Sequence, residues 1–119
     1  MSAIRETLED LRHAAGVKGA ALLTTDGLVA AASLDDRYAS DVVAGLTSYL
    51  LMTTNRSLAE AGLGQCSQFV LHATHGRAVF VSLGESYLVV LLDQFADVEA
   101  ARPEIQEAAL RIRRSARLG

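Results

Sequence analysis

The feature that most constrains the fold is an unbroken apolar run, Tyr-Leu-Val-Val-Leu-Leu, at positions 87–92. A strand with one face in water alternates apolar and polar residues, and this run does not alternate. It is also far too short to span a bilayer as a helix. A strand that is apolar throughout is normally covered on both faces. The run therefore predicts the central strand of a sheet that carries helices on each side.

Hydrophobic periodicity and turn residues divide the rest of the chain into further elements. Asp26-Gly27, between two apolar stretches, is typical of a tight hairpin, and so is Gly84-Glu85. The predicted elements are a helix at 2–15, strands at 17–25 and 28–33, a helix at 37–61, strands at 67–74, 77–83 and 87–92, and a helix at about 102–117. This order, αββαβββα, predicts an α+β fold with one five-stranded antiparallel sheet.

Two helix boundaries are predicted from their local chemistry. Asp35 or Asp36 is expected to cap the long helix, because a carboxylate accepts hydrogen bonds from the first backbone N–H groups. Proline is tolerated in the first turn of a helix, because the N–H that it lacks would have no partner within the helix there. Pro103 therefore favours a start near Arg102 for the last helix. We therefore expect residues 94–101 to form a connection.

Composition limits the functional classes. The 119 residues suffice for one hydrophobic core, so residues 1–119 are predicted to form a single domain. Half of the residues are apolar and 21% are charged, which excludes a disordered chain. A net charge of −3 offers no global basic surface for nucleic acid, and no apolar run suits membrane insertion. With one cysteine and no signal-peptide pattern, the protein is expected in the cytoplasm.

No residue pattern typical of catalysis or cofactor binding occurs in the sequence. The chain has neither a phosphate-binding loop nor the glycine pattern of dinucleotide-binding folds. Cys66, His72 and His75 do not match the spacing of a zinc site, and no identifiable base would activate Cys66 as a nucleophile. We therefore predict no catalytic residue, no metal and no cofactor, and that the protein is not an enzyme.

The long helix lacks charge over almost four turns. No charged residue lies between Asp41 and Arg56, whereas a helix with one wet face normally carries charges there. The stripe expected to face the core consists of Tyr38, Val42, Val43, Leu46, Tyr49 and Leu50. The other side is then neutral and partly apolar, and we predict that another protein covers it. The helix residues of this predicted interface are Ala44, Thr47, Ser48, Leu51, Met52 and Asn55.

The strand at 67–74 contains no Asp, Glu, Lys, Arg or Pro, the residues that protect a sheet edge from pairing. At an edge, such a strand would pair with the same strand of a second copy. A two-fold dimer in which helix meets helix and edge meets edge satisfies both observations. Lysine at Leu51 is accordingly expected to weaken this dimer more than the fold. The strand residues of the predicted interface are Phe69, Val70, Leu71, His72 and Ala73.

Three stretches and the order of the elements resemble the roadblock family, named after a dynein light chain. They are Gly-Val-Lys-Gly-Ala-Ala-Leu at 16–22 leading into Asp26-Gly27, Tyr-Leu-Val-Val-Leu at 87–91, and residues 102–109 in the last helix. The resemblance covers nearly the whole chain. It implies the sheet order 2-1-5-4-3, with the middle helix on one face and the two terminal helices on the other.

The resemblance also implies a function. It implies homodimerisation through the third strand and the middle helix, in agreement with the interface argued from the residues. Bacterial members look like non-catalytic adaptors that bind Ras-like small GTPases as dimers and in some cases stimulate GTP hydrolysis. The chain is therefore expected to bind such a GTPase, with other signalling proteins as further partners.

Two questions stay open at this point. Arg37, Arg56 and Arg77 are candidates for contacting the nucleotide of a partner, and no sequence pattern selects one of them. The alternative function is a sensor module in a signalling complex, which would need an apolar cavity with a few convergent polar groups to bind a small ligand.

Overall fold

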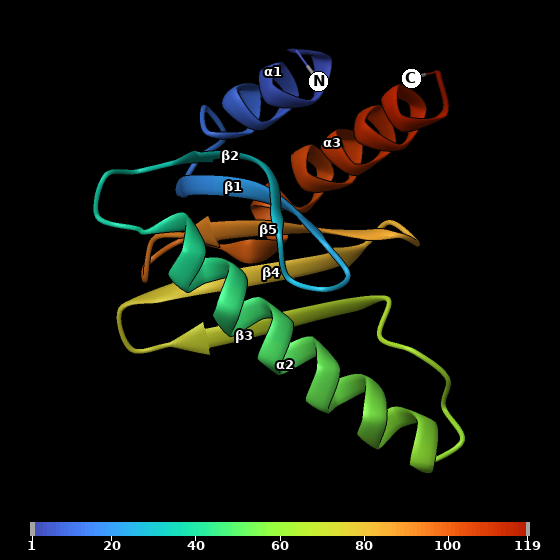
Figure 1. Ribbon diagram of the computed structural model, residues 1–119. Coiled ribbons are helices and arrows are strands. Elements are labelled where there is room, and N and C mark those ends of the chain that lie inside the picture. Colours follow the sequence, from blue (N-terminus) through green and yellow to red (C-terminus); the bar gives the residue numbers. More distant parts are fainter. Residues whose placement is uncertain (1, 119) are drawn as a thin grey trace.

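The computed structural model describes residues 2–118, and its elements follow the predicted order αββαβββα (Figure 1). Met1 and Gly119, the two ends of the predicted single domain, lie outside the described residues. The helices are α1 (Ser2–Leu11), α2 (Ser40–Glu60) and α3 (Val98–Leu118). The strands are β1 (Val17–Thr24), β2 (Val29–Leu34), β3 (Gln68–Ala73), β4 (Gly76–Ser82) and β5 (Ser86–Leu92).

The five strands form one antiparallel sheet in the order β2-β1-β5-β4-β3. β5 is the central strand, and its residue Val90 lies opposite Ala20 of β1 and Val79 of β4. β2 and β3 form the two edges. α2 crosses one face of the sheet, while α1 and α3 lie side by side on the other (Figure 1). The predicted α+β fold class and the sheet order that the resemblance implies are therefore confirmed.

A hydrophobic core lies on each face of the sheet. Leu88 and Val90 belong to the core beneath α1 and α3, and both have an exposed fraction of 0%. Tyr87 and Val89 belong to the core beneath α2. Successive residues of β5 are thus buried on opposite faces, which confirms the central strand predicted from the apolar run.

The hairpin between β1 and β2 is closed by its own hydrogen bonds and packs on α2. The N–H of Gly27 donates to the Thr24 carbonyl at 3.1 Å, and the Thr24 hydroxyl donates to the Asp26 carboxylate at 2.5 Å. Gly27 has φ +89°, and a Cβ atom there would lie 3.0 Å from the side chain of Ser48. Glycine therefore lets the hairpin tip turn this tightly and approach α2 this closely.

α2 begins at Ser40, and the prediction that Asp35 or Asp36 caps it is wrong. Ala39 occupies the N-cap position without a side-chain hydrogen bond to the helix. The Asp35 carboxylate accepts from the N–H of Arg37 at 3.2 Å instead. Asp35 thus closes a turn of its own before the helix starts, which keeps its carboxylate away from the first turn of α2.

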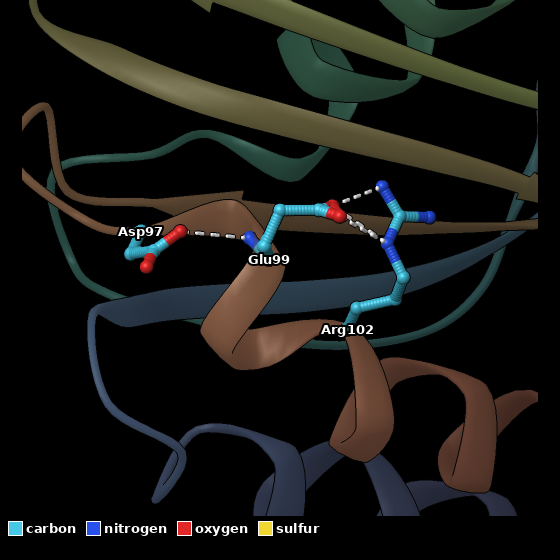
Figure 2. A network of polar contacts seen from close by, with 3 residues as sticks. All are labelled: Asp97, Glu99 and Arg102. Carbon is cyan, nitrogen blue, oxygen red and sulfur yellow. Dashed lines mark hydrogen bonds and ion pairs between the residues drawn. The ribbon is translucent and has the colours of Figure 1, made fainter.

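α3 begins at Val98 rather than near Arg102. Asp97 caps it by accepting from the N–H of Glu99 at 3.0 Å, and Glu99 pairs with Arg102 at 2.8 Å (Figure 2). The pKa of Arg102 is raised because its guanidinium donates to that carboxylate. Pro103 therefore lies inside the helix, beyond its first turn. The prediction from proline was wrong because the cap and the ion pair stabilise a turn that precedes it.

Candidate interaction surface

α2 packs on the sheet through Val43, Ala44, Thr47 and Leu51, none of which is more than 8% exposed. The Thr47 hydroxyl is satisfied because it donates to the Val43 carbonyl at 2.8 Å. The prediction that Ala44, Thr47 and Leu51 point outward is therefore wrong, since they are buried in the core of the protein itself. Small side chains at two of these positions let the helix axis approach the sheet.

The large apolar side chains of α2 point away from the sheet instead. Val42 and Tyr49 are each 66% exposed, Met52 is 56% exposed and Leu46 is 50% exposed. These four residues are called the outer face of α2 below. The expectation that Val42, Leu46 and Tyr49 face the core is wrong. α2 is apolar around most of its circumference, so periodicity does not distinguish the side that meets its own sheet.

Ser48, Met52 and Asn55, the other helix residues of the predicted interface, have different surroundings. Met52 is exposed, whereas Ser48 and Asn55 are half-buried on a flank of the helix. The backbone N–H of Cys66 donates to Asn55 Oδ1 at 2.7 Å, and Asn55 Nδ2 donates to the Tyr87 hydroxyl at 3.2 Å. Asn55 therefore ties the segment after α2 to both the helix and the sheet.

β3 is an edge strand, as the sheet order implied by the resemblance requires. The N–H of Ser82 donates to the Ser67 carbonyl at 3.0 Å beside the start of the β3–β4 pairing. Because hydrogen-bonded pairs alternate along an antiparallel ladder, the backbone N–H and C=O groups of Gln68, Val70 and His72 point away from β4. Such a row of outward groups is a template for pairing with another strand.

The side chains of β3 are only partly covered by the protein itself. Phe69 and Leu71 are half-buried on the α2 side, and Val70 is half-buried on the opposite side. His72 and Ala73 are exposed. The edge thus combines outward backbone groups with apolar side chains that retain exposed surface.

An apolar hollow of about 410 Å³ lies between α2 and the β3–β4 hairpin. Tyr38 and Leu46 line it on the helix side, and Leu71, Ala78 and Leu91 line it on the sheet side. Leu46 joins the hollow to the outer face of α2, and Leu71 joins it to the β3 edge. We call these three connected features the α2–β3 surface.

The three candidate arginines differ in their surroundings. The Arg37 guanidinium lies 5.3 Å from the centroid of the Tyr38 ring. Arg77 is half-buried and donates to a backbone carbonyl of β3 at 3.1 Å. Arg56 is exposed and follows Tyr49 by two helical turns, which places it in line with the outer face of α2. Of the three, Arg56 is therefore the one whose exposed side chain continues the α2–β3 surface along the helix.

Outside the α2–β3 surface, we examined the described residues for metal ligands, nucleophiles and membrane-spanning helices. Within residues 2–118, no three His, Cys, Asp or Glu side chains are grouped to hold a metal ion, so Cys66, His72 and His75 form no such site. Burial raises the pKa of the Cys66 thiol, which makes it a poor nucleophile at neutral pH. In the same part of the chain, none of the helices combines the length and hydropathy needed to cross a membrane.

Comparison with known proteins shows which family the chain belongs to. Residues 3–92 match the model of the Roadblock/LC7 domain. The chain is 31% identical over 110 residues to the uncharacterized protein MJ1340 of Methanocaldococcus jannaschii, and the match covers 92% of this chain and 96% of that protein.

Two solved structures share the fold. Myxococcus xanthus MglB superposes with a TM-score of 0.90 at 15% sequence identity, covering 98% of this chain and 89% of that one. The gliding protein MglB of Thermus thermophilus gives a TM-score of 0.87 at 19% identity, covering 99% and 91%. The family match over most of the chain agrees with the observed order of strands and placement of helices. The protein is a member of the Roadblock/LC7 family.

Proposed function

We propose that the protein is a homodimeric adaptor that binds a Ras-like small GTPase and regulates it without chemistry of its own. The observation that carries the proposal is the α2–β3 surface. Four large apolar side chains on one helix are half or more exposed there, and such a patch on a monomer marks an interaction site. The resemblance to roadblock regulators and membership of the Roadblock/LC7 family support the same function.

Two copies related by a two-fold axis at β3 would bury the exposed side chains of this surface and pair its outward backbone groups. Antiparallel pairing of two β3 strands would use the outward backbone groups of Gln68, Val70 and His72 and continue the sheet across both protomers. The far end of α2 extends past β3 in Figure 1, so each helix would reach over the sheet of its neighbour. The hollow beside Leu46 and Leu71 would then receive the helix of the second copy.

Such a dimer would create a binding platform for the GTPase. α2 has 21 residues and a length of about 30 Å, which leaves room for both dimer contacts and partner contacts. Two helices placed side by side form a platform that one protomer lacks. Because a GTPase has no two-fold symmetry, a partner bound on the axis would exclude a second, and we expect one GTPase per dimer. Arg56 is the arginine that we propose for any contact with its nucleotide.

The substitution His72→Pro is expected to weaken the dimer at least tenfold while the protomer stays folded. The His72 N–H points away from β4, so proline removes no hydrogen bond within the protomer but blocks pairing with a second β3. Sedimentation equilibrium would give the dimer dissociation constant, and urea unfolding would give the stability of the fold.

The matched control is Leu71→Pro, one position away. Leu71 faces Ala78 in a hydrogen-bonded pair, so this proline breaks the ladder to β4 and should cost about 1–3 kcal/mol of folding free energy. A His72→Pro variant that dimerises as tightly as the parent protein would show that β3 does not form the dimer contact.

The dimer is expected to bind a Ras-like GTPase from its own genome at least tenfold more tightly in one nucleotide state than in the other. A regulator must distinguish the two states, because a ligand with equal affinity for both shifts no equilibrium. Calorimetric titration of the dimer with the GTPase, loaded first with a non-hydrolysable GTP analogue and then with GDP, measures both affinities and the stoichiometry.

The outcomes of that titration separate the parts of the proposal. Equal affinities would retain the adaptor and remove the regulator. Absence of binding in both states, for every Ras-like GTPase of the genome, would contradict the proposed function as a whole. Full binding by a folded monomeric variant would contradict the requirement for the dimer.

A further inference from the structure

A second cavity, of about 620 Å³, lies on the flank of α2 opposite Leu46 and the hollow. The β1–β2 hairpin, the middle of α2, the segment after α2 and the turn between β4 and β5 surround it. Leu23, Leu51 and Tyr87 line it with side chains that are at most 9% exposed. Its volume falls in the range of small-molecule sites, which is roughly 300–1,000 Å³.

The walls of this cavity are held by bonds within the protein. The Thr24 side chain fastens the hairpin, because its hydroxyl donates to Asp26 and accepts from the N–H of Leu28 at 3.0 Å. The hairpin tip rests on α2 where Gly27 meets Ser48. On the other side, Asn55 holds the segment after α2. The cavity is therefore preformed, as binding sites for small molecules usually are.

The Tyr87 side chain lines the cavity, and its hydroxyl has a hydrogen to donate. The N–H of Cys66 donates to Asn55 Oδ1, which establishes that the other end of the amide is the NH₂ group. That NH₂ group donates to the Tyr87 oxygen at 3.2 Å, so the Tyr87 hydroxyl acts there as an acceptor. Its own hydrogen remains to be donated, and the hydrogen bonds among residues 2–118 include no acceptor for it. Tyr87 is 9% exposed as a whole residue and lines the cavity, so a molecule bound in the cavity can reach this side chain.

The charge of the lining selects against anions. The described lining contains no Lys, Arg or His, and its one carboxylate is Asp26, at the exposed hairpin tip. An anion would lose hydration without gaining a positive partner and would be repelled by Asp26. Ser48 and Gln65 add neutral polar groups to the lining. A cation or a neutral N–H donor would find an acceptor in Asp26.

We propose that this cavity binds an uncharged or cationic small molecule, which presents an acceptor to the Tyr87 hydroxyl and an N–H donor to Asp26. The site is separate from the hollow that the second copy would fill. Met52 lines the cavity and also belongs to the outer face of α2, so the bound molecule would contact a residue of the α2–β3 surface. The proposal does not depend on the dimer or on a GTPase.

Three probes that share one ring and differ in charge test it: benzamide, benzamidine and benzoate. Each is titrated into the full chain while ¹H–¹⁵N NMR follows the backbone amides. Benzamide has both a carbonyl acceptor for Tyr87 and an N–H donor for Asp26, and it is expected to shift the amides of Thr25, Ser48 and Gly84 with millimolar affinity. Benzamidine has donors for Asp26 but no acceptor for Tyr87, so it tests the contact with Asp26 alone. Benzoate has no donor and carries a negative charge, and it is expected to bind at least tenfold more weakly than benzamide. Asp26→Asn should remove any preference for benzamidine over benzamide. Tyr87→Phe keeps the ring and should weaken benzamide binding about tenfold.

A filled cavity provides the control. Gln65→Trp places a large side chain at the rim from an exposed position and should weaken both probes at least tenfold, whereas Gln106→Trp on α3 should change nothing. If Gln65→Trp does not fold, Thr25→Trp replaces it. The proposal is overturned if benzoate binds as well as benzamide, if the filled variant binds normally, or if no probe shifts these amides at about 10 mM. These results decide only whether the cavity binds a ligand. The dimer and the binding of a GTPase are tested by the separate experiments described above.

Discussion

Lysine in place of Leu51 is expected to unfold the protein. Leu51 is 3% exposed in the core between α2 and the sheet, where it packs in the same cluster as Leu23, Phe80 and Val89. The substitution removes a buried leucine, which costs about 2–5 kcal/mol, and it also buries an unpaired charge. A domain of this size is stable by about 5–15 kcal/mol, so most of that stability would be lost. Circular dichroism and urea unfolding measure the effect.

The sequence predicted the opposite, namely that Leu51→Lys would weaken the dimer more than the fold. A variant that remains folded and cooperative but becomes monomeric would support that expectation and contradict the observed rotation of α2. Leu51→Met serves as the matched control, because a side chain of similar volume should cost less than about 1.5 kcal/mol.

Lysine in place of Tyr49 is expected to separate the dimer into folded monomers. Tyr49 is 66% exposed at the centre of the outer face of α2, so the fold does not depend on its burial. In a two-fold dimer the substitution occurs twice and removes two aromatic contacts at a cost of about 2 kcal/mol each. The dissociation constant should therefore rise on the order of 1000-fold. Sedimentation velocity measures the dimer, and the unfolding free energy of the protomer should stay within about 0.5 kcal/mol.

The matched control is Gln106→Lys, an exposed substitution of the same kind on α3, which should leave the dimer intact. A Tyr49→Lys protein that remains dimeric would place the dimer contact elsewhere. The same monomeric variant serves the GTPase titration, where it should lose binding while Gln106→Lys retains it.

The order of elements and the sheet could be predicted because each rests on a local signal. The apolar run at 87–92 fits an interior strand of a sheet with helices on both faces, and in the structure it forms the central one. The hairpin at Asp26-Gly27 was predicted from two residues that tolerate a positive φ, but only Gly27 adopts one, at +89°, and Asp26 does not. The edge position of β3 was not indicated by its own residues; it followed from the sheet order that the family resemblance implies, and the structure confirms that order. The apolar run and the hairpin signal are each carried by a few neighbouring residues.

The rotation of α2 could not be predicted because it is decided by tertiary packing. Val42, Leu46 and Tyr49 are more apolar than Ala44 and Thr47, so hydrophobicity favours burying the wrong side. The sheet beneath α2 is already filled by residues such as Phe80 and Tyr87, and small helix residues fit above them. The start of α3 was missed for a different reason, since a cap at Asp97 outweighs the preference of proline for a first turn.

The central place of β5 has a consequence for synthesis of the chain. β5 is made after all the other strands, yet it joins the β1–β2 hairpin to the β3–β4 hairpin. Val17 pairs with Leu92, which lies far along the chain, so the pairing that completes the sheet is non-local and slow to form. Until residue 92 has left the ribosome, β1 and β4 each have one edge that lacks its partner strand β5. A chain that stalls there holds two hairpins whose open edges can pair directly with each other or with those of a neighbouring chain.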